Sequence, residues 1–169
     1  MKVINVNKTN VEIIDYRPEH QPWFENLNRE WIERYFSMEP LDIAVLQHPE
    51  EYILKQGGMI LMAKSDNEII GTAALKFVEY GVYEFTKMAV DKKFRGNGAG
   101  RVLAEAAIAK AKALGAHKII LYSNRVLENA ITLYRKLGFT ELPVDLVYKR
   151  SDIKMKLDLT GKEHESVDR

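Results

Sequence analysis

The sequence predicts a mixed α/β domain, built on a mixed sheet of six or seven strands with helices on both faces. Two observations carry this prediction. Three apolar runs in the middle of the chain follow one another with only short polar turns between them, which is typical of an antiparallel meander. Helical and strand patterns then alternate, which indicates crossover connections onto the same sheet. A chain of 169 residues is long enough to bury one sizeable core.

The first half of the chain is expected to contribute five elements. Its first strand alternates apolar and polar residues, and its first helix carries apolar residues at three- and four-residue spacing after Pro18. Ser65-Asp66-Asn67-Glu68 separates two apolar runs and signals a hairpin. The expected elements are a strand over residues 11–16, a helix over 18–36, a helix over 49–56 and strands over 59–64 and 69–78.

The second half is expected to add crossovers and to close the sheet. Gly115 and Gly138 follow two helical patterns, as C-terminal caps often do. The expected elements are a strand over residues 83–90, a helix over 102–114, a strand over 118–122, a helix over 128–137 and a strand over 153–159. We find no linker or internal repeat, so residues 1–169 are predicted to form one domain, with a frayed polar tail from about residue 160 to 169.

Composition excludes several classes of function. Lys plus Arg number 25 and Asp plus Glu 24, so the net charge of +1 argues against nucleic-acid and membrane-surface binding. The absence of cysteine excludes disulfides, thiolate zinc sites and a cysteine nucleophile. The four histidines show no ligand spacing, so no metal site is expected. The N-terminal residues lack the apolar core of a signal peptide and no run is long enough to cross a bilayer, so a cytoplasmic protein is expected.

A glycine-rich segment, residues 95–100, lies between an apolar strand and an alanine-rich helix. It reads Arg-Gly-Asn-Gly-Ala-Gly, so three positions lack Cβ atoms where the strand turns into the helix. The first N–H groups of a helix have no internal acceptor, and with Arg95 beside them they suit a pyrophosphate. A P-loop and a dinucleotide fingerprint both fail, because Arg101 stands where they need Lys or Gly. A purely structural turn is the alternative interpretation.

A second segment, residues 130–139, reads Ala-Ile-Thr-Leu-Tyr-Arg-Lys-Leu-Gly-Phe. Together with the loop, it resembles the two signatures of the GCN5-related N-acetyltransferase (GNAT) superfamily. The family's acetyl-CoA motif is Gln/Arg-x-x-Gly-x-Gly/Ala, which residues 95–100 match at each specified position. The resemblance covers roughly residues 11 to 159 and implies the acyl-CoA N-acyltransferase fold.

The resemblance implies an enzyme that moves an acetyl group from acetyl-CoA to a primary amine, by direct attack in a ternary complex. The backbone N–H of Ala89 or Val90 would bind the thioester carbonyl. The expected acceptor is a small molecule or an amino acid. A protein lysine or an N-terminal amine is one alternative, and a non-catalytic acyl-CoA sensor is another. The resemblance leaves a homodimer open.

Site residues follow from the same resemblance. Tyr134 would protonate the departing thiolate, since a phenol is protonated at neutral pH, whereas a core tyrosine is the alternative. Glu84 would take the amine proton through water, with a solvated glutamate as the alternative. Leu127 replaces an asparagine of many relatives, so Asn124 or Asn129 is expected to bind the cofactor arm. The expected cofactor-binding residues are Met88, Ala89, Val90, Arg95, Gly96, Asn97, Gly98, Ala99, Gly100, Arg101, Asn124, Asn129 and Tyr134.

The first helix carries an aromatic stripe and two acidic residues of interest. Trp23, Trp31 and Tyr35 are expected to pack in the core, with a substrate cage as the alternative. Glu30 and Glu33 either face the acceptor groove and attract a cationic amine, or are simply solvated.

Overall fold

The computed structural model describes residues 2–6, 9–145 and 148–159, and it confirms the mixed α/β class. The predicted tail over residues 160–169 lies outside the described residues. The strands are β1 (Lys2–Val6), β2 (Thr9–Asp15), β3 (Met59–Ser65), β4 (Glu68–Glu79), β5 (Val82–Val90), β6 (Lys118–Ser123), β7 (Thr140–Leu142) and β8 (Ile153–Asp158). The α-helices are α1 (Gln21–Tyr35), α2 (Pro40–Gln47), α3 (Ala99–Ala113) and α4 (Glu128–Lys136). Short helical turns are η1 (Pro18–His20), η2 (Glu50–Leu54) and η3 (Lys92–Phe94).

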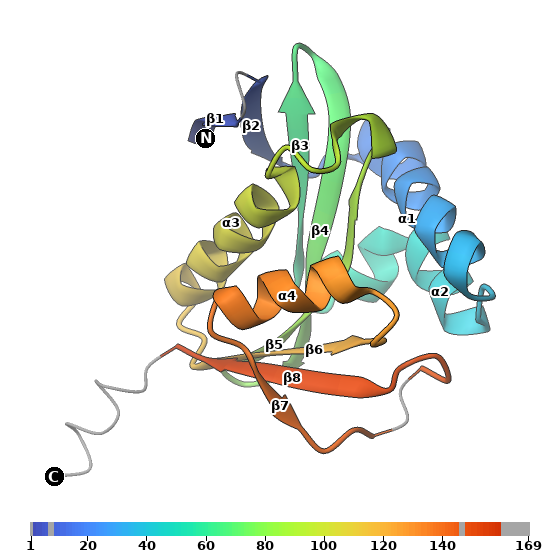
Figure 1. Cartoon of the computed structure of the whole chain (residues 1–169), viewed down its shortest axis with the longest axis vertical. Coiled ribbons are helices and arrows are strands. Elements are labelled where there is room, and N and C mark those ends of the chain that lie inside the picture. Colours follow the sequence, from blue (N-terminus) through green and yellow to red (C-terminus); the bar gives the residue numbers. More distant parts are fainter. Residues whose placement is uncertain (1, 7–8, 146–147, 160–169) are drawn as a thin grey trace, which may run out of the picture.

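Within the described residues the sheet has eight strands, in the order β1-β2-β3-β4-β5-β6-β8-β7 (Figure 1). The count exceeds the six or seven expected, because β1 and the three-residue β7 extend the two edges. A strand as short as β7 is too brief to show a period of two. The neighbours β5 and β6 run parallel, since α3 carries the chain back across the sheet between them.

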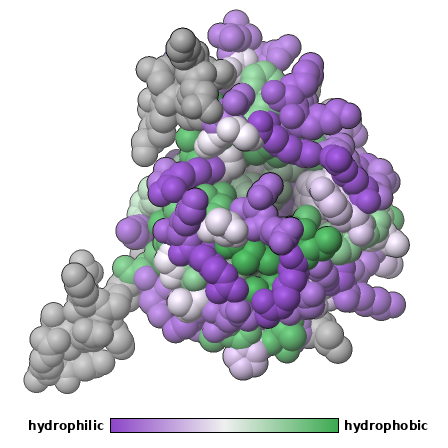
Figure 2. Space-filling model, viewed as in Figure 1, coloured by the Kyte–Doolittle hydropathy of each residue, from purple (hydrophilic) through white to green (hydrophobic). Residues whose placement is uncertain are grey.

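Helices cover both faces of the sheet and divide the core in two. Helices α3 and α4 pack on one face, and α1, α2 and η2 pack on the other (Figure 1). Neighbouring strand residues alternate between the two cores, as Leu61 and Met62 do. On the side of α3 and α4, hydrophobic residues gather in the middle and hydrophilic ones surround them (Figure 2).

Two helix predictions need correction. The expected helix over residues 49–56 is only the five-residue π-helix η2, and α2 precedes it unpredicted. The sequence pattern does not predict α2, because the helix is apolar nearly all round and its acidic residue, Asp42, is itself buried. Its apolar residues therefore show no helical period. Helix α3 begins at Ala99 and not at residue 102, so the glycine segment runs into its first turn.

Strands β5 and β6 diverge soon after they meet. Their pairing covers only residues 82–84 of β5 and 118–120 of β6. Further along, β5 contains a bulge against β4, in which Lys87 and Met88 together lie opposite Ala73. Lys87 has a φ of 54°, in the left-handed region that is uncommon outside glycine. The divergence opens the sheet between β5 and β6.

Candidate active site

A cavity of about 440 Å³ lies where β5 and β6 diverge. From β5 and the turn after it, the lining residues are Phe85, Thr86, Lys87, Met88, Ala89, Val90 and Arg95. From the end of β6 to α4 they are Tyr122, Ser123, Asn124, Val126, Leu127, Glu128, Asn129, Ala130 and Tyr134. From α1 and the segment before β8 they are Trp31, Tyr35, Phe36, Tyr148, Arg150 and Ser151. The cavity therefore unites residues from both signature segments of the sequence.

The glycine segment forms the approach to the first turn of α3. Gly96, Asn97, Gly98, Ala99, Gly100 and Arg101 do not line the cavity, which they adjoin at its Arg95 end. The N–H of Val102 donates to the carbonyl of Gly98 at 3.1 Å. In the part of the chain that the structure describes, the N–H groups of Ala99, Gly100 and Arg101 have no acceptor. Such a helix start suits an anion.

Arg95 adds a positive charge at this end of the cavity. Its Nε donates to the carbonyl of Val90 at 3.0 Å, and its guanidinium forms an ion pair with Glu30 of α1. Glu30 is also paired with Arg34 at 3.6 Å, and Glu33 is paired with Arg29 at 3.3 Å. Neither acidic residue lines the cavity.

Tyr134 lies at the base of the cavity, on α4. Its ring makes an edge contact with Phe85, with centroids 6.1 Å apart, and lies 5.8 Å from Phe139. The hydroxyl makes no hydrogen bond to any described residue, which a tyrosine held only for structure usually would. Burial raises the pKa of the phenol, so the group stays protonated at physiological pH. Its role as an acid stays a prediction.

Glu84 occupies the last paired position of β5 and β6 and does not line the cavity. Its exposed fraction is only 6%, so it is not the solvated glutamate considered as an alternative. Burial raises the pKa of this carboxyl, and the charges of Lys76 and Lys87 oppose that shift. A proton from the cavity could reach it only through an intermediary, and its role as a base stays a prediction.

The two asparagines near Leu127 differ in how they are used. The amide of Asn124 donates to the carbonyl of Arg150 at 2.6 Å, and its Oδ1 accepts from the N–H of Val126 at 2.9 Å. Asn124 therefore stabilises the loop. Asn129 is exposed on the first turn of α4, with no side-chain hydrogen bond among the described residues, and can turn toward a ligand.

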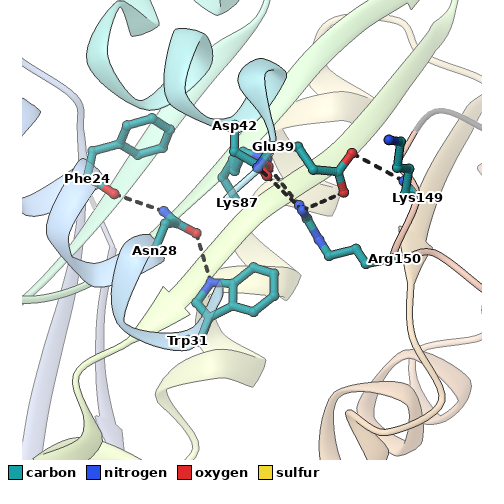
Figure 3. A network of polar contacts seen from close by, with 8 residues as sticks. All are labelled: Phe24, Asn28, Trp31, Glu39, Asp42, Lys87, Lys149 and Arg150. Carbon is teal, nitrogen blue, oxygen red and sulfur yellow. Dashed lines mark hydrogen bonds and ion pairs between the residues drawn. The ribbon is translucent and has the colours of Figure 1, made fainter. Parts of the chain in front are cut away.

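Trp23 and Tyr35 of the aromatic stripe on α1 lie outside the core, which corrects the prediction for them, whereas Trp31 is partly buried and packs against the core. The buried face of α1 carries Phe24, Asn28 and Ile32, one position away from the stripe. Trp31 and Tyr35 line the cavity, whereas Trp23 does not, and Trp23 and Tyr35 are each 47% exposed. The indole of Trp31 donates to Oδ1 of Asn28 at 3.0 Å, and the Asn28 amide donates to the carbonyl of Phe24 at 2.9 Å (Figure 3). Asn28 thus fixes the ring at the cavity wall.

A largely buried ionic cluster borders the cavity, and its two cations, Lys87 and Arg150, belong to the lining (Figure 3). Nζ of Lys87 is 3.0 Å from Oδ1 of Asp42, and both side chains are almost completely buried. Nη1 and Nη2 of Arg150 donate to the two oxygens of the same carboxylate, at 2.7 Å each. Nη1 also donates to Oε2 of Glu39 at 3.2 Å. Burial opposes ionisation of Asp42, but the hydrogen bonds from Arg150 and the charge of Lys87 prevail and lower its pKa to about 2. The cluster ties α2, the β5 bulge and the segment before β8 together.

Other kinds of site receive no support from the described residues. Over residues 2–6, 9–145 and 148–159, no three His, Asp or Glu side chains are grouped so that they could hold a metal ion. In the same part of the chain, no helix has both the length and the apolar character needed to span a membrane.

Comparison with known proteins decides the family. The model of the acetyltransferase (GNAT) family matches residues 20–139, which span the β5 strand, the glycine segment and Tyr134. The chain belongs to the acetyltransferase (GNAT) family. Two mycothiol acetyltransferases, from Thermobispora bispora and Streptosporangium roseum, are each 38% identical to it over 63 residues, or 37% of this chain. The match spans only 21% and 19% of those proteins, about a fifth of their length.

Solved structures of GNAT proteins share this fold. An acetyltransferase of the GNAT family from Staphylococcus aureus superposes with a TM-score of 0.79 at 22% identity, over 88% of this chain and 99% of that one. A PaiA N-acetyltransferase from Thermoplasma acidophilum, solved with coenzyme A, gives 0.70 at 18% identity, over 88% and 99%. At such identities the likeness shows the fold alone.

Several residues of this GNAT site carry no motif. Lys87 gives one usable signal, since a lysine in the interior of a mostly apolar strand needs a buried partner. Asp42, Tyr148 and Arg150 gave none, because their meeting depends on contacts between segments distant in sequence. Sequence motifs thus indicate the wall formed by β5 and α4, and of the opposite wall only Trp31 and Tyr35, through the alternative of a substrate cage.

Proposed function

We propose that this GNAT-family chain transfers the acetyl group of acetyl-CoA to a primary amine, by direct attack in a ternary complex. The observation that carries the proposal is the hydroxyl of Tyr134, which belongs to the lining of the cavity between β5 and β6 and has no partner among the described residues. A proton donor in that position matches the need of a departing thiolate. A sensor without chemistry has no use for an unbonded phenol there.

Backbone N–H groups would form most of the cofactor site. The diphosphate would bind the N–H groups at the start of α3, next to Arg95. The pantetheine arm would lie along residues 88–90 of β5, which have lost their pairing with β6. The N–H of Ala89 or Val90 would then donate to the thioester oxygen, and Asn129 would bind the arm in place of the asparagine absent at Leu127. The relatives' names and the coenzyme A of the PaiA structure support acetyl-CoA as the donor.

The transfer itself needs two side-chain roles, an acid for the departing thiolate and a base for the amine. The neutral amine attacks the thioester carbon, so that a C–N bond forms and the C–S bond then breaks. Tyr134 gives its proton to the thiolate sulfur as coenzyme A leaves. The proton lost from the amine passes through water to Glu84, whose buried carboxyl has a raised pKa and therefore holds a proton better than a solvated one. The phenol regains its proton from solvent.

Thiol release tests this proposal. The protein is mixed with acetyl-CoA and a panel of small amines and amino acids, and free coenzyme A and N-acetylated product are measured, with an acceptor-free control. We expect both products in equal amounts. Acetyl-CoA binding by calorimetry without thiol release across the panel would support the sensor, and release only with peptides would support a protein acceptor. Absence of acetyl-CoA binding would contradict the cofactor assignment.

A further inference from the structure

The charges at the far end of the cavity are unevenly placed. Among the described residues, the charged side chains that line it are Lys87, Arg95, Glu128 and Arg150. Arg95 belongs to the glycine segment and Glu128 to the first turn of α4, whereas Lys87 and Arg150 stand together at the aromatic wall. The carboxylates that compensate these two cations lie behind the lining. A ligand at the aromatic wall therefore meets the guanidinium of Arg150 first, since the Lys87 side chain is only 2% exposed.

Arg150 is held as a preformed binding group. Its Cζ lies 4.7 Å from the centre of the Tyr148 ring, 5.8 Å from that of Trp31 and 5.9 Å from that of Phe36. The side chain is 11% exposed, so a small part of it still reaches the cavity. A guanidinium fixed between rings in a partly dry site loses little entropy when it binds an anion.

The two carboxylates that touch Arg150 differ in how firmly they are held. Asp42 is completely buried and accepts from Lys87 and from the backbone N–H of Glu39 as well. Glu39 makes a single contact with Nη1 of Arg150 at 3.2 Å, and its side chain is 20% exposed. Glu39 also accepts from the backbone N–H of Lys149 at 3.2 Å and shares a capping box with Asp42, so both carboxylates stay in place and another carboxylate would use the remaining donors of Arg150. A guanidinium offers five N–H donors, and Nε has no acceptor among the described residues.

We propose that the acceptor is an amine that also carries a carboxylate, and that Arg150 binds this carboxylate. This inference rests on the proposed function. The amine would point toward the thioester between β5 and β6, and the carboxylate would lie at the aromatic wall. A diamine or polyamine fits poorly, because its second ammonium would meet the guanidinium of Arg150 at the aromatic wall. The acids of α1 that could attract it, Glu30 and Glu33, are paired with arginines and lie outside the lining.

Matched acceptors test the inference on the unmodified protein. Amino acids are compared with their carboxamides, with the amines formed by their decarboxylation and with diamines, in the thiol-release assay. We expect kcat/KM to fall by about 10- to 100-fold when the carboxylate is removed, as is typical for loss of a charged hydrogen bond. Equal use of amino acid and amide, or a preference for diamines, contradicts this inference alone. No thiol release with any acceptor contradicts the proposed function and this inference with it.

Variants assign the effect to Arg150. In Arg150→Met, Asp42 keeps Lys87 as its partner, so the fold is expected to survive, which the melting temperature checks. We expect KM for the carboxylated acceptor to rise by about 10-fold or more, with unchanged affinity for acetyl-CoA and unchanged use of the amide. Arg150→Lys, which keeps the charge and loses the planar donor pair, should show a smaller rise. Arg17→Met is the matched control, since Arg17 is exposed and does not line the cavity.

Glu39→Gln separates binding from a structural role. The variant keeps an oxygen for the N–H of Lys149 and removes the charge that competes for Arg150. If Arg150 binds the carboxylate, KM for the carboxylated acceptor stays the same or falls. A rise like that of Arg150→Met would show that the cluster acts only as a structural unit, and would contradict the inference. The acceptor series still decides the matter if Arg150→Met fails to fold.

Discussion

The glycines of the loop differ in what a side chain would do there. Gly98 has a φ of 83°, where an L-residue is strained, and it is the position before the first turn of α3. Gly100 has no such constraint, and a Cβ built on it would meet Met88, Leu133 and Val90 at 3.9–4.0 Å, which is ordinary contact. The family motif agrees, because it requires glycine at the first position and accepts alanine at the second.

Gly98→Ala is therefore expected to weaken acetyl-CoA binding, with Gly100→Ala as its matched control. We expect the former to lower the affinity by about tenfold or more and to destabilise the fold by about 1 kcal/mol, because the loop must leave the left-handed conformation to relieve strain. The control should retain both affinity and stability. Calorimetric titration and thermal unfolding measure the two effects. Equal affinities for acetyl-CoA in the two variants would contradict the assignment of the loop to the cofactor site.

Glu84 can be tested through the pH dependence of turnover. A base must be deprotonated to work, so activity should fall as the pH drops through the pKa of Glu84, which burial places above the usual range for glutamate. Glu84→Gln should lower kcat/KM by about 10² and abolish that acidic limb. Glu79→Gln, at the exposed end of β4, is the control. An unchanged profile in Glu84→Gln would assign the base to another group.

Three elements beside the cavity are held together by buried ionic contacts, whereas most other elements are held by apolar packing. Helix α2, the β5 bulge and the segment before β8 meet through Asp42, Lys87 and Arg150. Lys87 holds a left-handed backbone conformation that costs energy, and its buried ion pair with Asp42 offsets that cost. The cluster thus fixes the strand against which the thioester would lie.

Asp42→Asn should be strongly destabilising, because it leaves two buried cations without their shared carboxylate. We expect a loss of about 3–5 kcal/mol in the free energy of unfolding, measured with urea. The control Asp158→Asn, which breaks only the exposed pair with Lys156, should cost about 0–1 kcal/mol. Comparable losses in the two variants would show that the cluster does not stabilise the fold.

The lowered pKa of Asp42 also predicts that the free energy of unfolding decreases in acid. Its pKa falls from 3.8 to about 2 on folding, so ionised Asp42 contributes about 2 kcal/mol above pH 4. That contribution is lost as the pH drops from about 4 to 2, where the folded state must take up the proton. Unfolding free energies measured across this window should fall in the parent protein, and this part of the decline should be absent from Asp42→Asn.

At the scale of the whole molecule, the sheet consists of two parts joined by a short parallel pairing. Only three residue pairs link β5 to β6, and the cavity lies directly beyond them. Both signature segments flank this division, one at the end of β5 and one on α4. The family match and the shared fold of solved relatives agree with this arrangement.

Sequence patterns predicted most of this framework and the part of the cavity lining that β5 and α4 contribute. Elements with clear periodicity or glycine caps, such as α3 and β8, were found because local sequence determines them. The apolar α2 and the three-residue β7 were missed, since neither shows a usable period. Tyr134 was found through a motif, whereas Arg150 joined the site only through contacts more than 100 residues away in sequence, which no local pattern records.

We propose that acetyl transfer occurs between β5 and β6 with Tyr134 as the proton donor. The most direct test is kcat of Tyr134→Phe at saturating acetyl-CoA and amine, with cofactor affinity and melting temperature measured on the same sample. We expect a roughly 10- to 10³-fold fall in kcat. Affinity and melting temperature should hardly change, because the hydroxyl has no partner among the described residues. An unchanged kcat would rule out Tyr134 as the proton donor.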